Sequence, residues 1–440
     1  MAQLTESAPD AASSRVSRWL GSAHPAVFST WAILAAFSTY FCMYAFRKPF
    51  AAAGFEGEVG LGPLGTVDLK SVYVISQVVG YCISKFVGIK VISEIPAHRR
   101  ALGIAAVMGI AWGALLLFAV IPAPYNAICM LVNGLPLGMV WGLVFGWLEG
   151  RKVTEVLGAG LSASYILASG AVKSVGAALL VAGVTERWMP AMAGAMFALP
   201  MAGFVWMLAQ LPPPNAEDEA QRSHRAPMDG AARWAFVRRF GPGIITLTGL
   251  HVLLTSFRDF RDNFSREIYA AVGLAGDTAV FAKAEVPVAA GVLLVLALMA
   301  LIKNNRRALV AIHLIMAGGC ALIGISTLLW SSGLIGPVAW MTLVGLGLYI
   351  AYVPFGSMLF DRLFAATGAV GTAGFLIYVT DAFGYLGSVG LLLFKNFGFK
   401  ELSWLDFFLN ASYATSVVCA GCFVFAAAYF AKVARRPDEV

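Results

Sequence analysis

Charged residues are scarce in this 440-residue sequence. Asp, Glu, Lys and Arg together make up 12% of the chain, whereas hydrophobic residues make up 59% and the mean hydropathy is +0.78. Soluble domains carry about 25% charged residues, so this composition excludes an ordinary water-soluble fold. The net charge of +7 does not indicate nucleic acid as a partner, because the basic residues lie mostly in short segments between apolar runs.

The sequence also lacks the patterns of a metal site, a disulfide framework or an enzyme active site. Its six cysteines are scattered through apolar runs, where we expect small buried side chains. We find no nucleophile–base pair, metal-ligand spacing or phosphate-cradling glycine loop, and therefore expect no enzyme, no cofactor and no metal. The first ~25 residues are polar and mixed in charge, which does not fit a cleavable signal peptide.

Apolar runs of about 20 residues recur along the whole chain, each long enough to cross ~30 Å of hydrocarbon as a helix. Backbone groups in lipid must be hydrogen-bonded within their own segment, and continuous apolarity does not suit barrel strands. The sequence therefore predicts an all-α polytopic membrane protein. The expected spans are 26–46, 67–91, 100–121, 124–148, 157–183, 188–209, 243–269, 277–302, 308–330, 336–360, 368–394 and 404–432.

Basic residues are unevenly distributed among the segments that connect these spans. One set of connections, together with the two ends of the chain, carries most of the Arg and Lys residues. The opposite set offers only Arg187, Arg266, Lys395 and Lys400. This asymmetry predicts that both termini are cytoplasmic, in a bacterial-type cytoplasmic (inner) membrane.

The longest polar stretch divides the sequence into two related halves. Residues 211–242 are proline-rich and then charged, which is typical of a flexible linker, and Ala232–Phe240 within them could form a short interfacial helix. Arg47 and Arg258 are 211 positions apart, and similar offsets relate Phe145-Gly146 to Phe355-Gly356. Two six-helix halves repeated in parallel are the architecture of the major facilitator superfamily. The expected parts are a tail 1–25, a first half 26–210, the cytoplasmic linker 211–242, a second half 243–432 and a tail 433–440.

Nine charged residues fall inside the expected spans or at their deep ends. At about 3 kcal/mol each, nine bare charges in hydrocarbon would cost about 27 kcal/mol, which exceeds a typical folding free energy. They must therefore face one another or a wet cavity. The cations are Arg47, Lys85, Lys173, Arg258 and Arg261, and the acids are Asp259, Asp262, Glu285 and Asp381. Lys70 and Lys283 lie near span ends, and we expect them to extend to the surface.

Arg47 and Arg258, one in each half, are the strongest candidates for an anion-binding site. The planar guanidinium makes two parallel charge-assisted bonds to phosphate or carboxylate. Lys85 and Lys173 would add positive charge to the same cavity. For Arg261, Asp259 and Asp262, ion pairs that only lock helices together are an equally good interpretation.

Aromatic residues and one histidine are further candidates. Tyr40 and Tyr44 share a helix face with Arg47 and could donate hydrogen bonds to an oxyanion, although plain packing explains them equally well. Trp141 fits either a cavity wall or the core. His251 fits a satisfied interior histidine better than a proton carrier.

Several short motifs carry a resemblance to a known family. Arg47-Lys48 with Phe50 follow the first expected span directly. Ser84-Lys85-Phe86, Gly138-Met139-Val140-Trp141 and Phe383-Gly384-Tyr385-Leu386-Gly387 occur on the second, fourth and eleventh expected spans. They resemble motifs of the organophosphate:phosphate antiporter family of the major facilitator superfamily, typified by the glycerol-3-phosphate transporter.

The resemblance implies that two arginines hold a phosphoryl group and that an organic phosphate exchanges for inorganic phosphate. It places Arg258 and Glu285 on matching helices and brings Tyr385 into the substrate site. Lys48, Asp259, Asp381 and His251 are then candidates for coupling or gating. The chain departs from the family where Lys173 stands in place of a histidine. It also departs in its extra seventh-helix charges Asp259, Arg261 and Asp262, which would suit a zwitterionic substrate.

Three functions remain open at this level. The first is an antiporter that exchanges a phosphate- or phosphonate-bearing anion for inorganic phosphate. The second is a proton-coupled symporter of an organic anion or zwitterion that uses Glu285, Asp381 or His251. The third is a transporter-like membrane sensor. In each case the expected partners are a small anionic or zwitterionic solute and membrane lipid, and the protein is expected to be a monomer.

Overall fold

The structure, a computed structural model, describes residues 14–60, 62–151, 153–214, 218, 230–368 and 373–434. Twelve helices in these ranges are long and apolar enough to cross a membrane, which confirms the expected all-α polytopic fold. They are α2 (Pro25–Tyr44), α3 (Leu69–Glu94), α4 (Arg100–Val120), α5 (Ala127–Phe145), α6 (Thr154–Val181), α7 (Met189–Ala209), α9 (Gly230–Asn263), α11 (Val280–Ala300), α12 (Asn305–Ser331), α13 (Pro337–Ser357), α15 (Ala373–Leu393) and α16 (Trp404–Val433).

Short elements connect the long helices. A small antiparallel hairpin pairs Val59 with Val67. The short elements are α1 (Arg15–Ser22), η1 (Pro49–Ala52), β1 (Glu58–Gly60), η2 (Gly62–Leu64), β2 (Thr66–Asp68), η3 (Ala97–Arg99), α10 (Ser265–Ala271), α14 (Leu359–Thr367) and η4 (Phe394–Gly398).

Most expected boundaries lie within a few residues of the observed ones, and the two of the seventh span differ most. Helix α9 begins at Gly230, inside the stretch expected to be linker, and it continues past Pro242. It ends at Asn263, and α10 follows as a separate helix, so the expected span 243–269 is divided. Residues 1–13, 215–217, 219–229 and 435–440, in the expected tails and linker, lie outside the described residues.

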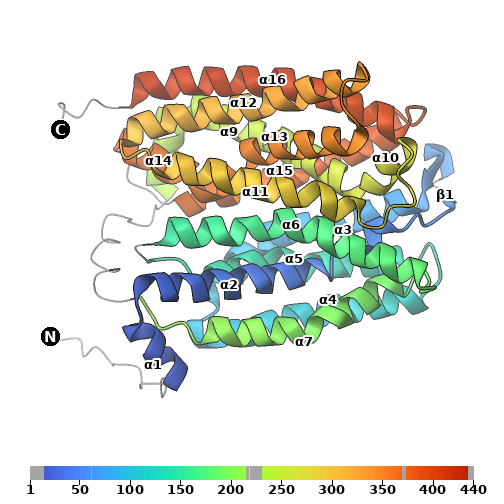
Figure 1. Cartoon of the computed structure of the whole chain (residues 1–440), viewed down its shortest axis with the longest axis horizontal. Coiled ribbons are helices and arrows are strands. Elements are labelled where there is room, and N and C mark those ends of the chain that lie inside the picture. The colour runs from blue at the N-terminus through green and yellow to red at the C-terminus, as the bar shows by residue number, and fades with distance from the viewer. Residues whose placement is uncertain are drawn as a thin grey trace.

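The helices form two bundles that lie side by side. Figure 1 shows α2 to α7, in blue to green, beside α9 to α16, in yellow to red. Helix α6 packs against α11, and α3 packs against α15, across the boundary between the bundles. The start of α2 and the end of α16 lie at one end of the molecule, which we call the terminal end. The hairpin and α10 lie at the other, the far end.

Small and polar residues bring the helices of the first bundle close together. A Cβ added at Gly80 would lie 2.1 Å from the carbonyl oxygen of Leu131, so only glycine fits where α3 crosses α5. Near this crossing, Asn133 Nδ2 donates to the carbonyl oxygens of Phe46 (3.1 Å) and Ala111 (3.0 Å). Such contacts are typical of helix packing in membranes, where lipid supplies no hydrophobic drive between helices.

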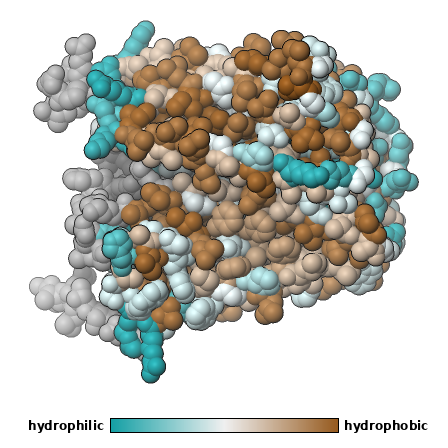
Figure 2. Space-filling view, in the orientation of Figure 1, coloured by the Kyte–Doolittle hydropathy of each residue, from teal (hydrophilic) through white to brown (hydrophobic). Residues whose placement is uncertain are grey.

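The outer surface of the molecule is largely apolar. In Figure 2 hydrophobic side chains cover much of the middle of the visible face, and many hydrophilic residues gather toward its two ends. Leu199, Val181 and Val417 are 83%, 78% and 74% exposed. Exposed side chains of this kind in twelve long helices indicate a multi-pass membrane protein, with the polar ends outside the hydrocarbon.

Candidate functional site

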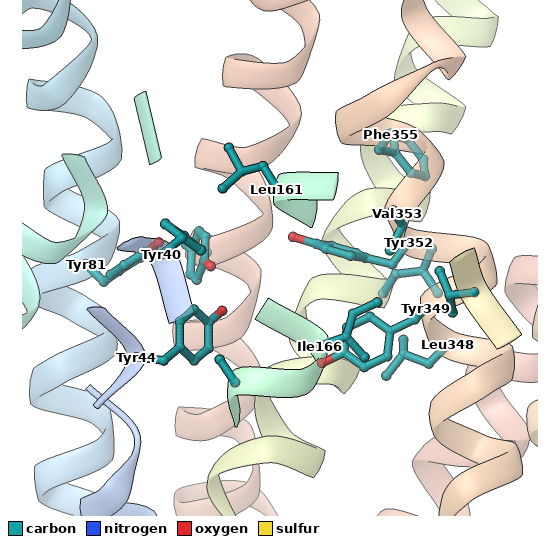
Figure 3. Packing of buried hydrophobic residues seen from close by; sticks show 14 of the residues in the cluster. Tyr40, Tyr44, Tyr81, Leu161, Ile166, Leu348, Tyr349, Tyr352, Val353 and Phe355 are labelled. Carbon is teal, nitrogen blue, oxygen red and sulfur yellow. The ribbon is translucent and has the colours of Figure 1, made fainter. Parts of the chain in front are cut away.

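A cavity of about 110 Å³ lies between the two bundles, among residues of α2, α3, α5, α6, α9, α13 and α15. Seven tyrosines line it. Figure 3 shows Tyr40, Tyr44 and Tyr81 on one side and Tyr349, Tyr352 and Phe355 on the other, with the hydroxyl of Tyr352 directed across the gap. The described wall consists of Tyr40, Tyr44, Tyr81, Lys85, Gly138, Trp141, Gly142, Phe145, Ser162, Tyr165, His251, Arg258, Tyr352, Phe355, Gly356, Ile377, Tyr378, Thr380, Asp381 and Tyr385.

Arg47 lies directly behind this wall. The loop after α2 carries it, and Gln77 Nε2 fixes its backbone by donating to the Arg47 carbonyl oxygen at 3.2 Å. Its guanidinium carbon lies 3.8 Å from the ring centroid of Tyr81 and 5.8 Å from that of Tyr385. The residue is 2% exposed, and its Nε and Nη2 have no hydrogen-bond partner in the described part of the chain. A buried cation therefore keeps two donor atoms free beside the cavity.

Arg258 enters the wall from α9. Its Nη2 donates to Asp259 Oδ1 at 3.0 Å and to the hydroxyl of Tyr385 at 2.9 Å. Its guanidinium carbon lies 4.4 Å from the ring centroid of Tyr352. One carboxylate and two phenol rings thus hold this cation in place, and the two arginines meet the same tyrosine, Tyr385, from opposite bundles.

An ion pair that joins the two bundles also forms part of the wall. Lys85 on α3 and Asp381 on α15 are 2.7 Å apart. His251 Nε2 lies 3.9 Å from Asp381 Oδ1, and its ring stacks on Tyr352 with the centroids 5.0 Å apart. Neither ring nitrogen of His251 has a hydrogen-bond partner among the described residues. Besides Arg258 and the tyrosines, the described wall thus carries Lys85, Asp381 and His251.

A second group of charges, which we call the Asp262 cluster, lies toward the far end. Asp262 at the end of α9 is 2.5 Å from Lys48 and 2.7 Å from Lys173, and it accepts a hydrogen bond from Ser169. Lys48 also donates to Asn263 Oδ1 at 2.9 Å. One carboxylate therefore joins α9 of the second bundle to the loop after α2 and to α6 of the first.

Two more buried ion pairs lie near the Asp262 cluster. Arg261 donates to Glu285 at 2.7 Å and to the carbonyl oxygen of Met341 at 2.9 Å. Lys70 lies 2.5 Å from Glu267 and is 4% exposed. The expectation that Lys70 extends to the surface is therefore wrong, because α10 brings a carboxylate to it.

The predicted site residues separate into two sets. The cavity wall contains eight of them: Tyr40, Tyr44, Lys85, Trp141, His251, Arg258, Asp381 and Tyr385. The others lie behind the wall or in ion pairs: Arg47, Lys48, Lys173, Asp259, Arg261, Asp262 and Glu285. The structure thus shows where the predicted site residues lie, and their roles in binding a solute stay predictions.

The expected position of Lys173 in the cavity needs correction. Tyr165 on the same helix lines the cavity, and Lys173 lies eight residues further along α6. At 1.5 Å per residue this is about 12 Å toward the far end. The charge of Lys173 is directed to Asp262 and not to the cavity wall.

Four wall tyrosines were missed at the level of sequence: Tyr81, Tyr165, Tyr352 and Tyr378. Helical spacing carries a signal for two of them, since Tyr81 precedes Lys85 by four residues and Tyr378 precedes Asp381 by three. Tyr165 and Tyr352 have no charged residue at such a spacing. Only the packing of α6 and α13 against the other helices places them at the cavity.

Comparisons with known proteins identify the fold and a family. Among solved structures, a D-xylose–proton symporter aligns with a TM-score of 0.58 at 15% identity, over 94% of this chain and 98% of that one. A mutant of the peptide transporter POT in complex with sulfate aligns with a TM-score of 0.58 at 13% identity, over 93% and 96% of the two chains. A POT-family transporter in complex with 5-aminolevulinic acid aligns with a TM-score of 0.56 at 13% identity, over 92% and 96%. These identities establish the transporter fold and no more.

Sequence comparison adds one result. A search of curated proteins found no match. A family profile described as "Family of unknown function (DUF5690)" matches residues 49–433. The narrower resemblance to organophosphate:phosphate antiporters therefore remains a prediction. The chain has the fold of the major facilitator superfamily and belongs to the family DUF5690.

Proposed function

We propose that this protein is a secondary active transporter of a small anion that bears a phosphate or phosphonate group, and that it exchanges this anion for inorganic phosphate. One observation carries the proposal. Arg47 and Arg258 come from the two different bundles, are almost fully buried, and approach the same tyrosine beside the cavity. The free Nε and Nη2 atoms of Arg47 are the donors to which an oxyanion would bind.

The charge balance around the cavity supports an anionic solute. The cations Arg47, Lys85 and Arg258 outnumber the carboxylates Asp259 and Asp381 by three to two, which leaves one net positive charge. A buried charge without a partner is costly in a low-dielectric interior. An anion bound between the arginines would neutralise this surplus and add hydrogen bonds to both bundles.

The same electrostatics favours exchange over one-way transport. In alternating access the two bundles rock about a central site, and in this proposal each bundle contributes one arginine to that site. An empty site must carry its uncompensated positive charge through this motion, whereas an occupied site does not. We therefore propose that the return step is fast only with an anion bound, and that inorganic phosphate is that anion.

The experiment uses the purified full chain in proteoliposomes loaded with labelled phosphate. Efflux is measured after external addition of buffer, inorganic phosphate, organic phosphates or phosphonates. We expect rapid efflux only when an anion that the site accepts is present outside. Arg258→Ala should abolish this stimulated efflux.

Arg99→Ala is the matched control, because Arg99 is an exposed arginine outside the cavity wall. It should exchange phosphate as the wild type does. Efflux that is equally fast with no external anion would refute exchange. Equal loss in both arginine variants would refute the assigned site.

A proton-coupled symporter of an organic anion or zwitterion is the second candidate. His251 favours it, since both ring nitrogens lack a partner in the described structure and Nε2 is 3.9 Å from Asp381. An inward pH gradient would then drive uphill uptake without internal phosphate, and His251→Gln would uncouple it. Absence of pH-driven uptake in the wild type excludes this candidate.

We further propose that the protein resides in the cytoplasmic membrane with both termini in the cytoplasm, as the positions of its basic residues predict. The Asp262 cluster then closes the outer side of the cavity. Protease accessibility of the linker 211–242 in sealed right-side-out and inside-out vesicles tests this orientation. Cleavage only in inside-out vesicles is expected.

A further inference from the structure

We propose that the wall around Asp381 is a subsite for an ammonium group, so that the transported solute is an amino-phosphonate or an amino-phosphate ester. The inference rests on the proposed function and specifies its substrate class. It starts from a conflict between two roles of Lys85. Lys85 is one of the cations that an anion would recruit, yet it is already bound to Asp381 at 2.7 Å.

A purely anionic solute cannot resolve this conflict. If its phosphoryl group draws Lys85 away, Asp381, whose side chain is 20% exposed, remains as a carboxylate without a cation in mainly aromatic surroundings, which is unfavourable. If Lys85 stays on Asp381, the solute has only the arginines to bind. The first alternative leaves Asp381 without a cation, and the second leaves Lys85 unable to bind the solute.

A solute that carries both charges exchanges partners with the ion pair. Its ammonium group takes the place of the Lys85 ammonium on Asp381, and Lys85 then binds the phosphoryl group together with the arginines. Lys85 and Asp381 each keep a partner of opposite sign before and after binding. The two charges of the solute therefore open the Lys85–Asp381 pair without leaving a buried charge alone.

The aromatic side chains around Asp381 suit an ammonium group. Lys85 Nζ lies 5.1 Å from the ring centroid of Tyr81 and 5.6 Å from that of Tyr385, within the range of cation–π attraction. Tyr378 lines the cavity three residues before Asp381. The wall around Asp381 thus already holds one primary ammonium, with a carboxylate and phenol rings as its partners.

Net charge supports the same substrate class. The surplus of one positive charge around the cavity, counted above, is best matched by a ligand of about −1. A phosphate monoester carries about −1.5 to −2 at pH 7, so an added ammonium brings it to about −0.5 to −1. Without the ammonium, the occupied site would be left with excess negative charge.

The test compares two pairs of compounds that differ only in the amino group. The pairs are 2-aminoethylphosphonate with ethylphosphonate, and phosphoethanolamine with ethyl phosphate. The readout is the external concentration that gives half-maximal efflux of labelled phosphate from proteoliposomes. In the wild type we expect the amino compound to act at about tenfold or more lower concentration, as one charged hydrogen-bonded contact provides.

Two variants locate the subsite. Asp381→Asn should reduce the preference for the amino compound to less than about threefold, since it removes one charged contact. That variant leaves Lys85 without its carboxylate, so the double variant Lys85→Gln/Asp381→Asn removes both members of the ion pair. It should respond to both members of each pair alike, and at higher concentrations than the wild type, because Lys85 no longer binds the phosphoryl group.

The outcomes separate this inference from the proposed function. If both members of each pair act alike in the wild type, the ammonium subsite is refuted and phosphate exchange stands. If the preference survives in both variants, an amino-specific site exists elsewhere and Asp381 is not its partner. If no phosphate or phosphonate stimulates efflux, both proposals fail together.

Discussion

Asp262→Asn is expected to weaken the closure of the far end. Asp262 compensates two buried ammonium groups, with Lys48 at 2.5 Å and Lys173 at 2.7 Å, and it belongs to the other bundle. Their side chains are only 2% and 3% exposed, so solvent screens the pairs very little. Removing one partner of a buried ion pair costs about 3–5 kcal/mol, because it leaves uncompensated buried charge.

This free-energy cost destabilises the state in which Asp262, Lys48 and Lys173 are in contact, which is the closed far end. At 1.36 kcal/mol per factor of ten, the closed state loses roughly 150- to 5,000-fold in its equilibrium with open states. Hydrogen exchange measured by mass spectrometry reads out this change. Amides of η1 and α10, at the far end, should exchange faster by up to that factor, whereas those of α12 should be unchanged.

Two other variants complete this experiment. Lys48→Gln leaves Lys173 on Asp262 and should give a smaller acceleration. Asp277→Asn removes the partner of Lys283, whose side chain is 60% exposed, and should change nothing measurable because exposed pairs contribute little. Unchanged protection of η1 and α10 in folded Asp262→Asn protein would refute the assignment of a closing role.

Further variants test the packing of the first bundle. Gly80→Ala should abolish expression of folded protein, because its Cβ would overlap the Leu131 carbonyl oxygen. Gly109→Ala is the control, because a Cβ at Gly109 meets open space, and it should express like the wild type. Size-exclusion chromatography in detergent compares the two variants. Asn133→Leu should lower the thermal unfolding midpoint, because the buried carbonyl oxygen of Phe46 loses its donor at about 1–3 kcal/mol and that of Ala111 loses a second donor beside its helical one. An unchanged midpoint would mean that neither carbonyl depends on Asn133.

The helices were predictable because lipid imposes one simple requirement on each segment. An apolar run long enough to cross the membrane must close its own hydrogen bonds, so twelve runs gave twelve helices. The boundaries failed where that requirement does not act. The start of α9, from Gly230, lies beyond the apolar run, and the amphipathic residues 232–240 predicted only a short interfacial helix, not one continuous with the next span.

The charged residues of the site were predictable, but their pairing was not. The high cost of charge in hydrocarbon singled out Arg258, Lys85 and Asp381, which the structure places on one wall. The same cost says only that a charge needs a partner and does not say which one. The sequence left open whether Lys173 faces the cavity, and its position along α6 brings it to Asp262 instead.

Aromatic wall residues were the hardest to predict. Tyrosine side chains occur in helix cores, at lipid interfaces and on cavity walls, so their positions in the sequence do not indicate which of these they occupy. Tyr165 and Tyr352 reach the cavity because α6 and α13 present those faces to it. That arrangement depends on how two bundles, far apart in sequence, lie against each other.

The most direct test of the central claim is equilibrium binding of labelled phosphate to the purified full chain. The arrangement of Arg47 and Arg258 predicts one saturable site per chain, lost in Arg47→Ala and retained in Arg99→Ala. Binding that is absent from the wild type, or that survives Arg47→Ala unchanged, would contradict an anion site between the two arginines.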